Sequence, residues 1–334
     1  MDVPGWAWAL TVVVIVVMLA VDYVGHVRSP HAPSVSESAR WSAGYVAVAL
    51  LFGVLLWLVW GGEYGGQYLA GYVTEKSLSV DNLFVFVLVM ASFRVPRRNQ
   101  QKVLLVGITL SLALRAALIF AGAVLIENVS WVFYLFGAFL LYAAWTQVRG
   151  REAAEGEYAD NVVLRLTRRV LRSTDDYVGD ALVVRRDGVR YVTPMLAVML
   201  AIATADVLFA VDSIPAIFGL TEQTYLVFTA NAFSLLGLRQ LFFLVDGLLD
   251  RLVYLSYGLG AILGLIGIKL VLHALHVNEL PFVNHGAPVG VPEIGTWWSL
   301  VVIVVVLAVT TLLSLRRTGR DVRASQRRAT EEPA

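Results

Sequence analysis

Two apolar stretches of the chain carry the same pattern of oxygen-bearing side chains. The stretch "TEKSLSVDNLFVF" begins at Thr74, and "TADVLFAVDSIPAIF" begins at Thr204. Each has two acidic residues six positions apart, and a small polar residue directly follows the second acid. These residues are Glu75, Asp81 and Asn82 in the first stretch and Asp206, Asp212 and Ser213 in the second. Carboxylate, amide and hydroxyl oxygens are the ligands that hard divalent cations prefer, so the pattern predicts a cation site.

Four acids inside apolar segments need compensation. An ionised side chain at the centre of a bilayer costs about 2.5–3.5 kcal/mol on insertion scales. The chain has no cysteine, which excludes thiolate ligands and favours Mn²⁺, Ca²⁺ or Mg²⁺. The same carboxylates could bind protons when the metal leaves, as coupling in an antiporter requires. The alternative is internal charge pairing that only locks the two stretches together. The basic residues available for it inside apolar segments are Lys76, Arg115, Arg239 and Lys269.

The elements that hold these residues are expected to be transmembrane helices. Of the 334 residues, 58% are hydrophobic and 15% are charged, whereas about a quarter of a soluble domain is charged. Apolar segments of about 20 residues can span a bilayer as helices. They lie near residues 6–27, 42–62, 67–93, 101–126, 129–148, 193–219, 224–245, 251–274 and 296–315. The predicted fold class is an all-α polytopic membrane protein with about nine transmembrane helices.

Lysine and arginine in the connections indicate the orientation, because they concentrate on the cytoplasmic side. The connection 94–102, the segment 149–192 and the tail after Leu315 are rich in arginine. Neither lysine nor arginine occurs in the connections 61–66, 127–128, 220–223 and 275–295. The two kinds alternate, which predicts an outside N-terminus and an inside C-terminus.

The cytoplasmic segment 149–192 and the tail have their own patterns. "NVVLRLTRRVLR" predicts an interfacial amphipathic helix, and "ALVVRRDGVRYV" predicts a β-hairpin around Asp187–Gly188. The tail "RASQRRATEEPA" has the composition of a disordered segment.

Three consecutive spans repeat later in the chain. "LSLALRAALIFAG" compares with "FSLLGLRQLFFLVDG", which aligns Arg115 with Arg239, and "YLFGAFLLYAAW" compares with "YGLGAILGLIGIK". The predicted orientation makes the copies inverted, as in many secondary transporters. The expected organisation is two N-terminal helices in 1–66, a first three-helix repeat in 67–148, a basic linker in 149–192, a second inverted repeat in 193–275, and an outer loop, last helix and basic tail in 276–334.

The two acids of one copy would not share a face of a continuous helix, because six residues correspond to about 600°. A helix break between them would bring both to one site. Gly71 and the polar "SLS" run would allow such a break in the first copy, and Pro215 would end the second.

The two acidic stretches closely resemble the paired signatures of the TerC/Alx family of integral membrane proteins. The similarity lies in "GYVTEKSLSVDNLFVF" and "DVLFAVDSIPAIFGLT", and "ANAFSLLGLRQLFF" resembles the family's second-repeat helix. It covers about residues 42–275. The family is associated with Mn²⁺ efflux, tellurite resistance and, in some members, metal supply for exported enzymes. The resemblance implies a metal role for Glu75, Asp81, Asp206 and Asp212, with Asn82 and Ser213 as neighbours.

The chain departs from the family pattern at two positions. It has Ala203 where members commonly carry another acid, and Thr146 where a lysine matching Lys269 is frequent. Losing one acid and one base preserves the charge balance while changing the affinity for metal.

We therefore expect a secondary transporter in the cytoplasmic (inner) membrane that exports Mn²⁺ in exchange for protons by alternating access of the two repeats. Mn²⁺ would be the transported substrate, and the bilayer and protons the other partners, with no organic cofactor and no nucleic acid. The alternatives are a non-transporting scaffold in metal or tellurite stress or exoenzyme metalation, and a transporter of another divalent cation such as Ca²⁺. The chain has no phosphate loop, nucleophile triad or HExxH motif, so an enzyme is not expected.

A second group of metal-binding residue types is expected at the outer end of the 251–274 span. An outer metal-collecting site is one interpretation, and helix-end histidines that face water are the other. The residues concerned are His273, His276, Glu279, His285 and Glu293.

Overall fold

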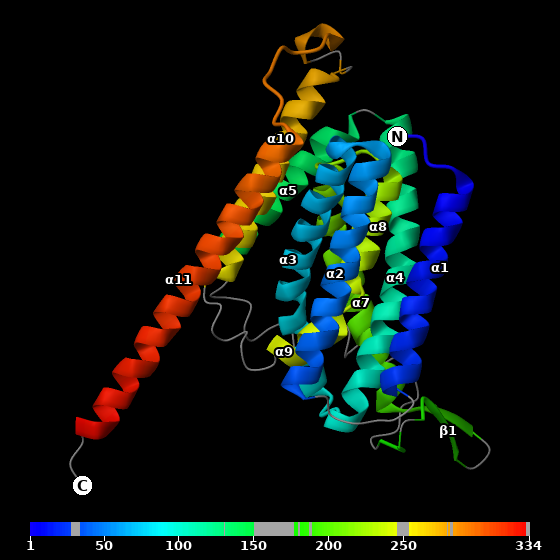
Figure 1. The fold of residues 1–334 in the computed structure, drawn as a ribbon, viewed down its shortest axis with the longest axis vertical. Coiled ribbons are helices and arrows are strands. Elements are labelled where there is room, and N and C mark those ends of the chain that lie inside the picture. Colours follow the sequence, from blue (N-terminus) through cyan, green and yellow to red (C-terminus); the bar gives the residue numbers. More distant parts are fainter. Residues whose placement is uncertain are drawn as a thin grey trace.

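The computed structural model is an assembly of helices with one small hairpin (Figure 1). It describes residues 1–27, 34–129, 131–149, 177–179, 181–186, 189–245, 254–278, 280 and 283–331. The N-terminal half contains α1 (Gly5–Asp22), the π-helix η1 (Tyr23–Val27), α2 (Val35–Trp60), α3 (Gly62–Ser92), α4 (Arg97–Asn128) and α5 (Val132–Arg149). The C-terminal half contains β1 (Val183–Arg186), β2 (Val189–Val192), α7 (Pro194–Phe218), α8 (Thr224–Leu235), α9 (Leu238–Val245), α10 (Leu255–His276), the 3-10 helix η4 (Asn284–Gly286) and α11 (Thr296–Glu331).

Helices occupy all nine predicted spans, one of which is divided into α8 and α9. Within the described residues, seven segments are long and apolar enough to cross a membrane, and α3 and α5 fill the two other predicted positions. Apolar side chains such as Val13, Leu58 and Val305 face outward, whereas the charged side chains of Glu75 and Arg115 are buried. This distribution is the reverse of a soluble protein, and it makes the chain an all-α polytopic membrane protein.

The predicted helix breaks beside the acids are wrong. The helix α3 runs without interruption through Gly71 and the "SLS" run, and α7 continues through Pro215. Gly71 instead permits close packing, because a Cβ atom there would lie 3.2 Å from Cγ2 of Ile217 and 3.3 Å from Cβ of Ala230. Pro215 lies in the last turn of α7, where one missing amide donor ends the helix without dividing it.

The interruption lies instead in the second span of the second repeat. Leu236 is extended and Gly237 has a φ of 86°, so α8 ends at Leu235 and α9 starts at Leu238. Gly237 also faces Tyr45 of α2, and a Cβ atom there would lie 2.9 Å from Cβ of that tyrosine. Only glycine combines this backbone conformation with this approach.

The packing of the six repeat helices is symmetric under exchange of the two copies. The helix α3 packs on α8 as α4 packs on α7, while α3 also packs on α7 and α5 on α10. The helices α5 and α10 run in opposite directions, because Gly137 faces Val271 while Ala144 faces Gly260. Figure 1 shows α10 and α11 leaning away from the main bundle, which contains α3, α7, α4 and α8.

The connections gather at the two ends of the bundle according to their basic content. At one end, Asn99 donates to the carbonyl of Gly179 (3.1 Å), and the hydroxyl of Tyr177 donates to the carbonyl of Phe93 (2.8 Å). At the other end, Thr221 donates to Gln67 (2.7 Å). The arginine-rich connections thus lie opposite those without lysine or arginine, as the predicted topology requires, and the assignment of the arginine-rich end to the cytoplasm stays a prediction.

The two antiparallel strands of the predicted hairpin are confirmed, with Arg186 of β1 paired with Val189 of β2, whereas the predicted turn residues Asp187 and Gly188 lie outside the described residues. The predicted amphipathic helix at 161–172 lies outside the described residues. The prediction of a disordered tail is wrong up to Glu331, because α11 continues to that residue. The sequence between 320 and 331 has no glycine or proline, and its arginine, alanine and glutamate residues favour a helix.

Candidate functional site

The centre of the candidate site is the side chain of Arg115, in the middle of α4. It joins the first acid of each repeat, Glu75 on α3 and Asp206 on α7. All three side chains are buried. Because Gly71 faces Ile217 while Arg115 contacts both Glu75 and Ser213, α3 and α7 run antiparallel past this centre. The two inverted stretches therefore meet where their matched acids share one cation.

The contacts of Arg115 are directional. Its Nε donates to Oδ2 of Asp206 at 2.7 Å and its Nη2 to Oδ1 at 3.0 Å, which is a bidentate pairing. Its Nη1 donates to Oε1 of Glu75 and, at 3.3 Å, to Oγ of Ser213. The hydroxyl of Ser111, one turn before Arg115 on α4, donates to Oδ2 of Asp206. Asp206 therefore accepts four hydrogen bonds when the one from Nη2 to its backbone carbonyl, 3.4 Å long, is included.

The charges at this centre do not cancel. One guanidinium faces two buried carboxylates, and Oε2 of Glu75 has no hydrogen-bond partner among the described residues. Charges attract and repel strongly in a buried, poorly polarisable setting. The centre therefore retains negative charge and one free carboxylate oxygen, which a cation or a proton would satisfy.

The remaining predicted ligands belong to the same two helices. Asp212 on α7 is half-buried and interacts electrostatically with Glu75 and Arg115. Asn82 on α3 is buried, and its Nδ2 has no partner in the described part of the chain. Asp81 lies in α3, and its side chain is outside the described set. The structure thus brings Glu75, Asp206 and Ser213 together at Arg115, with Asp212 within electrostatic reach.

The described residues contain no preformed metal cluster. Among the residues that the structure describes, no three His, Asp or Glu side chains converge closely enough to hold a metal ion. Arg115 lies between Glu75 and Asp206, where a cation would otherwise join them. A cation could bind both acids only if the guanidinium moved away from at least one of them.

The other three basic residues have separate partners. Lys76 donates to the backbone carbonyl of Ser234 at 3.0 Å. Lys269 interacts electrostatically with Glu222 at the opposite end of the bundle from the arginine-rich connections. Arg239, which aligns with Arg115, pairs instead with Asp22 of α1 at 2.8 Å.

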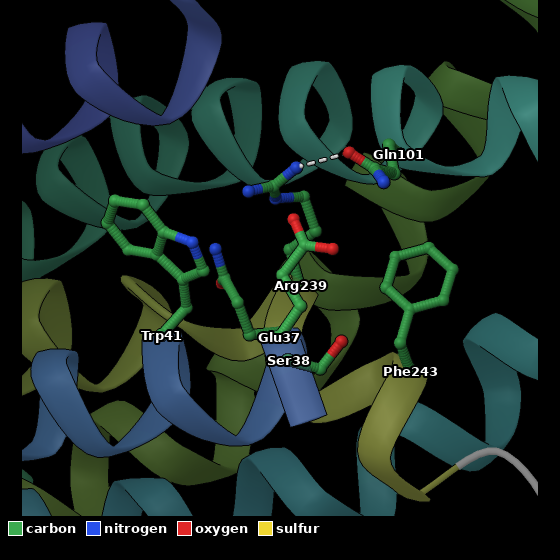
Figure 2. Close-up of a pocket in the computed structure, with 7 residues that line it drawn as sticks. Glu37, Ser38, Trp41, Gln101, Arg239 and Phe243 are labelled. Atoms are coloured by element: carbon green, nitrogen blue, oxygen red, sulfur yellow. Dashed lines mark hydrogen bonds between the residues drawn. The ribbon is translucent and has the colours of Figure 1, made fainter. Parts of the chain in front are cut away.

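Asp22 is a buried charge that the sequence analysis did not single out. Its Oδ1 accepts from Nη2 of Arg239 and, at 2.9 Å, from Gln240. Figure 2 shows Arg239 also reaching Gln101 of α4, and its Nη1 donates to Oε1 of Gln101 at 3.0 Å. The only sequence signal was an acid at the end of an apolar segment, which reads equally well as an interfacial residue. The cluster fastens α1 and α4 to α9.

The histidine group is an ion-pair network at the other end. Nε2 of His273 lies 2.8 Å from Glu222, and its Nδ1 lies 3.7 Å from Glu293. His276 is 3.9 Å from Glu293. The hydrogen bond with His273 lowers the pKa of Glu222, although partial burial opposes this shift. His285 lies in η4, and Glu279 is outside the described residues. Among the residues that the structure describes, no three His, Asp or Glu side chains converge closely enough to hold a metal ion, so the interpretation as a metal-collecting site finds no support there.

Comparison with known proteins identifies the family. The model of the integral membrane protein TerC family matches residues 60–322. The chain belongs to the TerC family. The match includes Arg115 and both acidic stretches, whereas α1 with Asp22 precedes it. No solved structure matches the chain.

Three relatives illustrate the range of proteins that the chain is similar to. An uncharacterized membrane protein of Mycobacterium tuberculosis is 51% identical over 317 residues, which are 94% of this chain and 80% of the relative. The putative membrane-bound redox modulator Alx of Escherichia coli is 38% identical over 275 residues, 79% of this chain and 85% of the relative. An uncharacterized membrane protein of Myxococcus xanthus is 39% identical over 269 residues, 80% of this chain and 84% of the relative.

Proposed function

We propose that this TerC family protein is a secondary transporter that exports Mn²⁺ across the cytoplasmic membrane in exchange for protons. The observation that carries the proposal is the shared centre at Arg115. Glu75 and Asp206 occupy matching positions in two antiparallel helices and meet in the interior of the protein. Buried carboxylates at the interface of two inverted repeats are typical of the sites of ion-coupled transporters.

The formal charge of the acidic stretches fits a divalent cation. The two stretches contain four carboxylates, and the described contacts and the sequence give them two basic residues, Arg115, which pairs with Glu75 and Asp206, and Lys76, which lies within the first stretch. Two negative charges therefore remain. One divalent cation or two protons would neutralise them, which is the exchange that an electroneutral antiporter performs. Oxygen ligands and the absence of cysteine favour Mn²⁺, Mg²⁺ or Ca²⁺ over thiophilic metals.

The contacts of Arg115 suggest which acid changes partners. Asp206 is held by two nitrogens of the guanidinium and by Ser111, whereas Glu75 is held through a single nitrogen. Glu75 is thus the acid that a cation would detach more easily, since its second oxygen is already free. Asp212, within electrostatic reach of Glu75, would provide the next carboxylate.

The exchange symmetry of the helix packing supports alternating access. The pairs α3 with α8 and α4 with α7 are equivalent when the copies are swapped. A protein of this kind can open to either side by rocking one copy against the other around a fixed central site. The two arginines break the symmetry, because Arg115 holds the acids while Arg239 holds Asp22.

Manganese tolerance of cells tests the proposal. A strain that lacks its own manganese exporters would express the wild-type protein, Asp81→Asn, Asp212→Asn, or Glu222→Gln as a control acid away from the centre. We expect wild type and the control to raise tolerance, and both aspartate variants to lose this effect at equal membrane abundance. Unchanged tolerance in both aspartate variants would contradict a shared site.

A non-transporting scaffold is the second candidate. The Arg115 pairing also fits it, because these contacts could have the sole role of holding the two repeats together. It predicts that the purified protein moves no metal. Transport of another divalent cation such as Ca²⁺ is a variant of the main proposal. The Alx relatives are named as putative redox modulators. This chain has no cysteine, so it has no thiol for such a role.

A further inference from the structure

A row of buried polar atoms on α3 and α8 has no hydrogen-bond partners among the residues that the structure describes. The side chains concerned are no more than 5% exposed. The atoms are Oγ1 of Thr74, Oε2 of Glu75, Oγ of Ser79 and Nδ2 of Asn82 on α3, and both side-chain atoms Oδ1 and Nδ2 of Asn231 together with Oγ of Ser234 on α8.

Such groups are costly to leave unsatisfied in a protein interior, and natural structures contain few of them. Their concentration on two adjoining helices points to an occupant that supplies the missing partners. The two helices are in close contact, because a Cβ atom at Gly71 would lie 3.3 Å from Cβ of Ala230. Five of the seven atoms are oxygens, and Glu75 brings negative charge. The row is therefore suited to a hard cation and the water that accompanies it.

The end of α8 adds a second cation-attracting feature. The last carbonyls of a helix have no intrahelical donor, and they carry the negative end of the helix dipole. Here the end of α8 lies inside the bundle, because Gly237 interrupts the span. Ser234 lies in this last turn, and its backbone oxygen accepts from the ammonium of Lys76 at 3.0 Å. This is the only hydrogen bond of the Lys76 ammonium within the described residues, although an ammonium can donate three.

We propose that the C-terminal end of α8 is a binding position for a small hard cation, and that the ammonium of Lys76 occupies it as a tethered cation. Its ligand in the structure is the Ser234 carbonyl, and the unpartnered oxygens of Ser79, Asn231 and Ser234 itself would complete the site around a free cation. A lysine ammonium carries the same charge as Na⁺ or K⁺, and it is held there by the chain.

The consequence is that the site discriminates cations by their charge. Free Na⁺ or K⁺ gains no charge advantage over the tethered ammonium, whereas a divalent ion near Glu75 does. This consequence rests on the proposed function, since it treats the row beside Glu75 as part of a cation path. Lys76 would then exclude monovalent cations and keep the position filled while no metal is bound.

The test is the thermal stability of the purified full-length protein without divalent metal, measured in chlorides of choline, Li⁺, Na⁺ and K⁺ at equal ionic strength. Lys76→Met removes the ammonium and keeps the length of the side chain. We expect its melting temperature to be lower than that of wild type in choline, and to rise by about 3 °C or more at 150 mM Na⁺ or another alkali ion, with saturation. Wild type should melt at the same temperature in all four salts.

Two further variants separate this reading from a general salt effect. Lys269→Met also removes a partly buried lysine from a span, but one that interacts with Glu222 beside the N-terminal end of α8 rather than with its C-terminal end, and should show no alkali-specific rise. Adding Asn231→Leu to Lys76→Met should abolish the rise. If Lys76→Met folds poorly, Lys76→Gln replaces it. Equal melting temperatures of the Lys76 variant in choline and in all three alkali salts would overturn the proposal. Failure of both Lys76→Met and Lys76→Gln to fold in Na⁺ would overturn it as well.

The outcome is independent of manganese transport. An alkali-dependent Lys76→Met protein with no Mn²⁺ flux in the wild type would leave the cation position standing and remove the proposed function. Mn²⁺ flux in the wild type without any alkali effect in the variant would do the reverse.

Discussion

Arg115 on α4 makes a bidentate side-on contact with Asp206 on α7, with Nε 2.7 Å from Oδ2 and Nη2 3.0 Å from Oδ1. The same guanidinium reaches Glu75 on α3 through its third nitrogen. A single side chain therefore connects the second helix of the first repeat with the acid-bearing helices of both repeats. Stability and the proposed transport site both depend on this contact.

Replacing Arg115 with methionine should destabilise the protein strongly. The change leaves Glu75 and Asp206 as buried carboxylates without their cationic partner, and loss of one member of such a pair costs about 3–5 kcal/mol. The melting temperature of the solubilised protein would show this loss.

The double variant Arg115→Met with Asp206→Asn should recover part of it, because one uncompensated charge disappears. Arg115→Lys should be intermediate, since a lysine keeps the charge but cannot make the bidentate contact. Equal melting of wild type and Arg115→Met would show that the pairing contributes nothing.

Asp22→Asn should weaken the attachment of α1. Asp22 accepts from both Arg239 and Gln240, so the variant leaves the guanidinium of Arg239 buried beside a neutral amide. We expect a loss of about 3 kcal/mol, in the range for a broken buried pair. The double variant Asp22→Leu with Arg239→Met, which replaces both charges by apolar groups, should be more stable than either single change. Additive losses in the double variant would argue that the two residues do not interact.

Gly137 and Gly264 offer a matched pair at the interface of α5 and α10. A Cβ atom at Gly137 would lie 2.7 Å from Cγ2 of Val271 and 3.1 Å from the carbonyl of Gly267, whereas one at Gly264 would meet only Cβ of Ala144 at 3.8 Å. Gly137→Ala should therefore cost about 1–3 kcal/mol by overpacking. Gly264→Ala should be neutral or gain up to about 1 kcal/mol from helix propensity. Comparable melting temperatures for the two variants would mean that α5 and α10 are less closely packed.

Acid should loosen the link between Glu222 and His273. The hydrogen bond with His273 lowers the pKa of Glu222 below its usual value of 4.5, against the opposing effect of burial. A lowered pKa in the folded state means that the link stabilises the protein above the usual carboxyl range and that this contribution is lost as the pH falls through the lowered value.

Melting curves of wild type and Glu222→Gln from pH 7 to pH 3 measure this contribution. Wild type should melt at a higher temperature near pH 6, and the difference should close at the acidic end. A difference that stays constant down to pH 3 would assign it to something other than ionisation of Glu222.

Much of the architecture was predictable because a bilayer constrains both length and composition. Nine apolar segments predicted nine helix positions, and alternating arginine content predicted which connections gather at each end. The repeated acid spacing pointed to Glu75 and Asp206, which the structure places on one guanidinium. The family resemblance is confirmed by the match over residues 60–322.

The position of the helix interruption was not predictable from local composition. Proline beside an acid suggested a break at Pro215, but that residue falls in the final turn of α7. The real interruption lies in "LLGL", which reads as uninterrupted apolar helix. It depends on Gly237 packing against Tyr45, almost two hundred residues earlier. The pairing of Arg239 with Asp22 is likewise a long-range contact between segments that show no local relation.

The most direct test of the central claim is metal flux into proteoliposomes that contain the purified wild-type protein. Uptake of Mn²⁺, Ca²⁺, Mg²⁺ and Zn²⁺ would be followed with and without a pH gradient, beside Asp212→Asn and protein-free liposomes. The proposed mechanism predicts Mn²⁺ uptake that the pH gradient accelerates, with proton movement in the opposite direction, and no uptake in Asp212→Asn. Wild-type liposomes that accumulate none of the four metals faster than protein-free liposomes would contradict it.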